Sequence, residues 1–178
     1  MTFNKDKFKW LVHYIVWRAG DDDGFGATKL NKVLWFSDAR THTLTGEPIT
    51  GATYIREKYG PVPRQMMPVQ KELEREGTIK ITRPSRDYEH TRFKALIPPI
   101  AGQLTSSEFQ TVNYWIDHIS KAHTARSISD ETHEDYSWQI AEMGEELPLN
   151  AIRLARIEEP SGEELERLRK RAKELGLH

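Results

Sequence analysis

The residues best suited to chemistry lie in one short segment, SDETHEDYSW, which runs from Ser129 to Trp138. His133 is at its centre, between Asp130 and Glu131 on one side and Glu134 and Asp135 on the other. A histidine tuned by carboxylates could act as a general base. No nucleophile motif or phosphate-binding loop accompanies it. We therefore favour a structural role, in which His133 and Trp138 pack against the main domain, and keep a hydrolase as an alternative.

Other common reactive sites are missing from the sequence. None of the seven histidines forms an i, i+4 pair that could share a metal ion, and His118 and His123 are five residues apart. The absence of cysteine excludes thiolate metal sites, cysteine nucleophiles and disulfides. The GxGxxG, GxxxxGK, GxSxG and HExxH signatures are also absent. We expect no metal, no cofactor and no enzymatic activity.

The composition predicts a soluble globular protein. The chain has 178 residues, of which 37% are hydrophobic and 30% charged, and its formal net charge is −1. This length suits one main domain with an appendage, and we expect a helical domain over residues 1–145 and an extension over 146–178. The N-terminus lacks a signal-peptide pattern and no apolar run is long enough to span a bilayer, so we expect a cytoplasmic protein.

Apolar periodicity and capping residues predict the first four helices of the main domain. The first begins after Asn4, with Phe3 and Phe8 as a hydrophobic staple, and ends at Gly20. The second runs from about Thr28 to the residue before Gly46. The third spans 63–76, with Pro68 either kinking it or lying in its first turn. A capping box over 105–108 opens the fourth helix, whose inward face comprises Phe109, Val112, Ile116 and Ile119.

The segment after the third helix predicts a β-hairpin. Ile79 and Ile81 alternate with polar residues, and a β-compatible run follows from Thr91 to Ile97. The expected fold is therefore mainly α with a small β-hairpin, and its helix-helix-helix-hairpin segment resembles a winged helix. A less regular helix is expected over 129–143, and a capping box over 161–164 opens a charged amphipathic helix that carries Leu165 and Leu168.

Charge around the expected hairpin raises the possibility of DNA binding. Residues 61–100 carry eight Lys or Arg, namely Arg64, Lys71, Arg75, Lys80, Arg83, Arg86, Arg92 and Lys94. Five acidic residues are interleaved with them, which weakens the counterion-release contribution to nucleic-acid affinity. We therefore favour a solvated surface, and a winged-helix regulator is the second function that we consider.

The segment from Lys29 to Pro63 supplies architecture and little reactive chemistry. It reads KLNKVLWFSD, then GEPITG over 46–51, then YGPVP over 59–63. These blocks, followed by a Ser, a His and a Trp, resemble the Panacea domain of SocA-like and GepA-like antitoxins. The residues that carry this resemblance are Lys29, Leu30, Lys32, Gly46, Pro48, Gly51, Gly60, Pro61, Pro63, His133 and Trp138.

The resemblance implies a mainly helical antitoxin of a bacterial or phage toxin–antitoxin pair, which neutralises its toxin by direct binding. One family member also delivers its toxin to a cytoplasmic AAA+ protease, and an adaptor role of this kind stays an alternative here. A frame of glycine and proline residues suits recognition because a preorganised surface loses little conformational entropy on binding. The contact residues that we predict are Glu47, Tyr54, Arg56, Lys58, Tyr59, Leu165 and Leu168.

Overall fold

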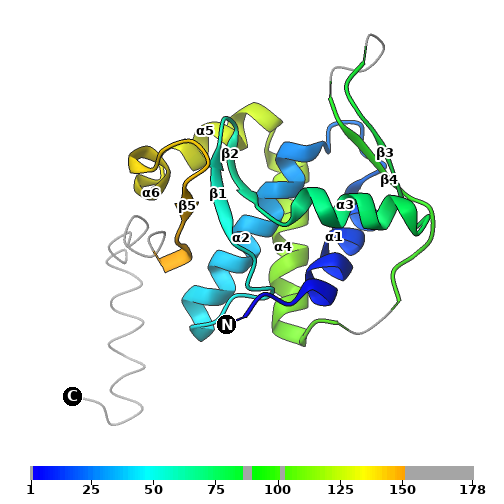
Figure 1. Ribbon diagram of the computed structural model, residues 1–178, viewed down its shortest axis with the longest axis horizontal. Helices are drawn as coiled ribbons and strands as arrows, with labels where there is room; N and C mark the ends of the chain where they lie inside the picture. The colour runs from blue at the N-terminus through cyan, green and yellow to red at the C-terminus, as the bar shows by residue number, and fades with distance from the viewer. Residues whose placement is uncertain (1, 86–89, 101–102, 151–178) are drawn as a thin grey trace.

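The computed structural model describes residues 2–85, 90–100 and 103–150. Helix α1 (Lys5–Ala19) and helix α2 (Ala27–Thr45) form its centre together with α4 (Ser106–Ala122). Figure 1 shows α3 (Met66–Arg75) and the hairpin of β3 (Ile79–Thr82) and β4 (Arg92–Ala95) on one side of these helices. On the other side lie β1 (Tyr54–Glu57), β2 (Gly60–Pro63), β5 (Glu146–Leu147), α5 (Ala125–His133) and α6 (Tyr136–Ile140). The fold is mainly α with small antiparallel sheets, as the sequence predicts.

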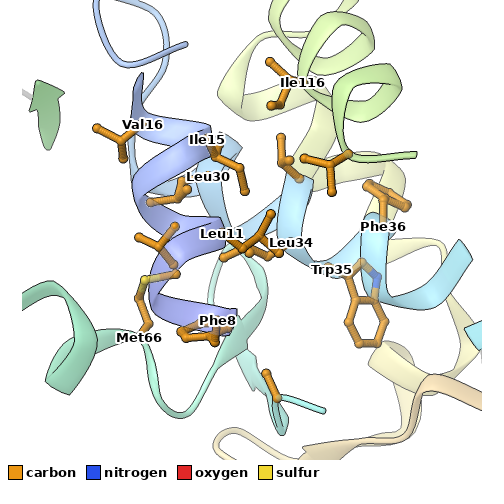
Figure 2. Packing of buried hydrophobic residues seen from close by; sticks show 14 of the residues in the cluster. Phe8, Leu11, Ile15, Val16, Leu30, Leu34, Trp35, Phe36, Met66 and Ile116 are labelled. Atoms are coloured by element: carbon orange, nitrogen blue, oxygen red, sulfur yellow. The ribbon is translucent and has the colours of Figure 1, made fainter. Parts of the chain in front are cut away.

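One hydrophobic core joins the central helices. Phe8, Leu11 and Ile15 of α1 pack against Leu30 and Leu34 of α2, and all five are fully buried (Figure 2). Ile116 extends this core onto α4 and Met66 extends it onto α3. The core fixes α2 between α1 and α4, and it thereby holds Lys32, Ser37 and Asp38 of α2 inside the protein.

Local signals confirm most of the predicted helix ends. The Asn4 side chain accepts a hydrogen bond from the Lys7 amide, and the rings of Phe3 and Phe8 lie 5.6 Å apart. The capping box of Thr105 and Glu108 is formed at the start of α4. Pro68 lies in the first turn of α3, where its missing N–H leaves no helical hydrogen bond broken.

Three predictions about these elements need correction. Phe109 lies on the edge of α4 and is 45% exposed, whereas the other three residues of its predicted inward face are buried. The single helix expected over 129–143 is instead α5 and α6, which are separated at Glu134 and Asp135, where Asp135 caps α6. The segment from the GEPITG block to the YGPVP block, in which we predicted no strand, contains a second hairpin, in which β1 pairs with β2.

Helix α3 is tied to α1 by ion pairs as well as by core contacts. The Lys5 and Lys9 amines lie 2.6 and 3.0 Å from the Glu72 carboxylate. Hydrogen bonds from these two amines lower the pKa of Glu72 to about 2. Acidic residues interleaved with the basic ones on α3 therefore serve partly as structural partners.

β5 joins the sheet from the far end of the described chain. The sheet order is β2-β1-β5, and Tyr54 and Ile55 pair with Leu147 and Glu146. Residues just beyond position 145, where we expected the main domain to end, therefore contribute to its sheet. The predicted helix with Leu165 and Leu168 lies outside the described residues. None of the helices in the described ranges is long and apolar enough to cross a membrane.

Candidate functional site: a buried polar frame under the β1–β2 hairpin

The carbonyl oxygen of Tyr59, in the turn between β1 and β2, accepts two side-chain hydrogen bonds. Lys32 donates from α2 with its Nζ 2.7 Å away, and Ser129 donates from α5 with its Oγ 2.6 Å away. Glu57 pairs with Gly60, so Lys58 and Tyr59 form the whole connection between the strands. Two helices that are far apart in sequence thereby fix one peptide group at the end of the hairpin.

Gly60 leaves the space that the Lys32 amine occupies. A Cβ atom on Gly60 would lie 1.7 Å from Lys32 Nζ and 2.7 Å from Thr132 Oγ1. Gly60 also has a φ of +106°, a conformation that residues with a side chain rarely adopt. The glycine in the YGPVP block is therefore required for two reasons: its backbone conformation has a positive φ, and the Lys32 amine occupies the place that a side chain would take.

The Lys32 side chain is almost completely buried, with 1% of the residue exposed. Burial disfavours its charged form and lowers its pKa to about 7. Its Nζ is held at the Tyr59 carbonyl and is covered by the hairpin. Lys32 therefore holds the turn in place, and its amine is not accessible to a substrate.

Asp38, one and a half turns after Lys32 on α2, holds the other end of the segment. Its carboxylate accepts hydrogen bonds from the Thr50 amide at 3.1 Å, the Thr50 hydroxyl at 2.9 Å and the Tyr54 hydroxyl at 2.8 Å. Asp38 and Thr50 are fully buried. Burial raises the pKa of Asp38, an effect that these donors oppose, and burial and the nearby carboxylate raise the pKa of Tyr54 well above its usual value. This network joins the GEPITG loop to the first strand.

Trp138, on α6, is sandwiched between two side chains at the edge of the frame. The His133 ring stacks on it with centroids 3.8 Å apart, and the Arg56 guanidinium lies 4.1 Å from its ring centroid. Arg56 also donates to the carbonyl of Ala141 at 2.9 Å. The stack fastens α6 to β1. We refer to Lys32, Asp38, Gly60, Ser129 and Trp138 with their partners as the hairpin frame.

The frame gives no support to acid–base catalysis by His133. Burial lowers the pKa of His133, and the charges of Lys32 and Arg56 lower it further. The neighbouring hydroxyls of Ser129 and Thr132 both donate to backbone carbonyls, at 2.6 and 2.8 Å. Neither hydroxyl is directed at the imidazole as a nucleophile would be.

Metal coordination finds no support within residues 2–85, 90–100 and 103–150. The His118 and His123 Nε2 atoms do come within 3.3 Å of each other, where the chain reverses between α4 and α5. Even so, no group of three or more His, Cys, Asp or Glu side chains in these ranges is arranged to hold an ion.

The predicted contact residues divide into buried and exposed ones. Tyr54 is 1% exposed and belongs to the Asp38 network, so it cannot touch a partner in this conformation. Arg56 is half-buried against Trp138. Glu47 and Lys58 are exposed, and Tyr59 is 60% exposed. Leu165 and Leu168 lie outside the described residues.

Most of the motif residues are buried around the frame. Lys29, Leu30, Lys32, Gly60, Pro61 and Pro63 are buried, and Gly51, Pro48, His133 and Trp138 are half-buried. Gly46 is the exposed C-cap of α2, with a φ of +84°. Glu47 and Pro48 line a surface groove of about 570 Å³ with Leu147 and Pro148 from the far end of the described chain. The motif thus builds the frame, and its exposed parts are the turns.

Three of the basic residues that we counted over 61–100 have acidic partners. Arg83 bonds Glu74 at 2.8 Å, Arg92 lies 3.1 Å from Asp23, and Arg64 lies 2.8 Å from Glu146. Arg86 is outside the described residues. These pairs neutralise several of the charges on which a DNA-binding surface would depend.

Comparison with known proteins identifies the family of this chain. Residues 30–139 match the model of one protein family, described as antitoxin SocA-like, Panacea domain. No curated protein and no solved structure matches the chain. The matched range begins in α2 and ends in α6, so it contains every member of the hairpin frame. The chain belongs to the family of SocA-like antitoxins with a Panacea domain.

Proposed function

We propose that this protein neutralises a cognate toxin in the cytoplasm by binding it directly, and that it is not an enzyme. The observation that carries the proposal is the hairpin frame. Two of its polar side chains, Lys32 and Ser129, hold the β1–β2 turn in place, and this turn presents Lys58 and Tyr59 to solvent. Such an arrangement serves recognition better than it serves catalysis.

Tyr59 has the features of an interface anchor. It is 60% exposed, yet its backbone carbonyl is held by two side chains, so the position of the residue is fixed before binding. Tyrosine is enriched among the residues that dominate interface energies, and a preorganised one loses little entropy on association. Lys58 adds a positive charge beside it, with its amine 5.2 Å from the Tyr59 ring centroid.

A growth-rescue assay tests this proposal. The wild-type protein should restore growth when it is co-expressed with the toxin encoded by a neighbouring gene, and it should co-purify with that toxin. Tyr59→Ala should weaken the complex about tenfold or more. Tyr114→Ala is the matched control, because Tyr114 is also 60% exposed but lies on α4.

Two results would count against the proposal. A wild-type protein that neither rescues growth nor binds any neighbouring gene product would overturn it. Equal effects of Tyr59→Ala and Tyr114→Ala would remove the hairpin turn from the interface. Rescue in a strain without its cytoplasmic AAA+ proteases would show that binding alone neutralises the toxin, whereas loss of rescue there would favour the adaptor role.

A further inference from the structure

The outward side of α6 and the turn after it form an exposed apolar surface, which we call the α6 face. Tyr136 and Ile140 are each 64% exposed and lie four residues apart, on the same side of the helix. Met143 follows in the turn and is 58% exposed. Exposed large apolar residues in such a group are typical of interaction sites.

The α6 face is held rigidly although α6 is short. Its opposite side carries the buried Ser137 and the Trp138 ring, which Arg56 and His133 sandwich. The following turn is closed by the Glu145 carboxylate, which accepts from the Glu142 amide at 2.6 Å. The Gly144 amide donates to the backbone carbonyl of Arg56 in β1 at 2.8 Å. The exposed side chains therefore stand on a fixed backbone.

The surroundings of the α6 face are strongly acidic. Residues 130–146 contain seven Asp or Glu and no Lys or Arg. Basic side chains accompany some of these acids: Arg126 lies 4.0 Å from Asp130, Arg64 lies 2.8 Å from Glu146, and His123 lies 3.7 Å from Glu131. Glu134, Glu142 and Glu145, which we call the acidic rim, are exposed, and within the described ranges no Lys or Arg lies within 4.0 Å of their carboxylates.

We infer that the α6 face binds a basic amphipathic segment of the toxin, which places apolar side chains on Tyr136, Ile140 and Met143 and Lys or Arg beside the acidic rim. This inference rests on the proposed function and names the surface and the chemistry of the partner. Complementary charge accelerates encounter and selects the partner, while desolvated apolar contacts supply most of the affinity. The same negative field repels nucleic acid.

The α6 face lies close enough to the hairpin turn for both to contact the same toxin. Trp138 joins α6 to Arg56 on β1, and β1 leads directly to Lys58 and Tyr59. Figure 1 shows α6 and the β1–β2 hairpin at the same end of the molecule. One interface of ordinary size is large enough to include both the α6 face and the hairpin turn.

Matched pairs of variants in the full-length chain test this inference. Met143→Gln is compared with Met67→Gln, because Met67 is similarly exposed, at 57%, but lies on α3. Glu142→Lys is compared with Asp21→Lys, which makes the same charge change at an exposed residue after α1. Affinity for the purified product of the neighbouring toxin gene is measured by titration calorimetry at 50 and 300 mM salt, with circular dichroism as the check on folding.

We expect Met143→Gln and Glu142→Lys each to weaken binding about tenfold at 50 mM salt, and the two controls to change it less than twofold. Glu142→Lys should also reduce the salt dependence of the wild-type affinity. If the wild type binds the toxin and all four variants bind equally well, the α6 face is not the site, although the proposed function stands. If the wild type does not bind, the proposed function fails and this inference fails with it.

Discussion

Replacing Gly60 by alanine should greatly lower the free energy of unfolding, because the new methyl group would clash with the Lys32 amine. The Cβ would lie 1.7 Å from Lys32 Nζ, so the amine must leave the Tyr59 carbonyl. Loss of a hydrogen bond from a charged group costs about 1.5–3 kcal/mol. Holding a non-glycine residue at a φ of +106° adds about 1–3 kcal/mol. The sum is about 2.5–6 kcal/mol, against a total stability of about 5–15 kcal/mol for a typical domain.

Gly46→Ala is the matched control for this experiment. Gly46 has a φ of +84°, but no atom lies within 4 Å of the position that its Cβ would take. It should therefore show the conformational cost alone, about 1–2 kcal/mol. Urea unfolding followed by tryptophan fluorescence gives both values. A Gly60→Ala variant no less stable than Gly46→Ala would refute the idea that this glycine makes room for Lys32.

Three further changes test other parts of the structure. The pKa of Lys32 is lowered to about 7 in the folded protein from 10.5, so between pH 7.5 and 9.5 the unfolded chain binds more protons and the free energy of unfolding of the wild type rises with pH. Lys32→Met should flatten this rise. Urea midpoints measured across this pH range test the prediction. Asp38→Asn should lower the free energy of unfolding by about 3 kcal/mol, because the new NH2 group would face hydrogen-bond donors, three of which now bond the carboxylate. A melting temperature within a degree or two of the wild type would contradict this. Asn4→Ala removes the N-cap of α1 and should cost about 1 kcal/mol in urea unfolding, whereas no change would show that the cap is dispensable.

The helical part of the fold could be predicted because its signals are local. Asn4 and the capping box of Thr105 and Glu108 mark helix starts within four residues of chain, and the apolar spacing of α1 reports its buried face directly. Phe109 shows the limit of this reasoning. It shares the spacing of the buried residues but lies in the first turn of α4, where the packing of neighbouring elements decides exposure.

The β1–β2 hairpin was not predicted because its sequence contradicts the usual strand pattern. Pro61 and Pro63 lie within β2, and proline is normally rare in strands because it lacks an N–H. Both are accommodated here because β2 is at the edge of the sheet. The third strand, β5, pairs with β1. It has only two residues and comes from about ninety residues further along the chain, which no local pattern can indicate.

The hairpin frame could be predicted in part. The motif supplied Lys32, Gly60, His133 and Trp138, but their spacing gave no indication that Lys32 and Ser129 share one carbonyl acceptor. Thr132 was missed, although its hydroxyl borders the space above Gly60. A lysine inside the apolar face of α2 was the available signal, since a buried amine needs an acceptor supplied by another element.

The central claim is that the hairpin frame presents the β1–β2 turn and the adjoining surface to a toxin. Hydrogen–deuterium exchange on the complex tests this claim most directly. The full-length protein is compared with and without the purified product of its neighbouring toxin gene. We predict slower exchange of the amides at 57–60 and 136–143 in the complex. Slower exchange confined to the β3–β4 hairpin or to the outer side of α4, with no change at those two segments, would contradict the account.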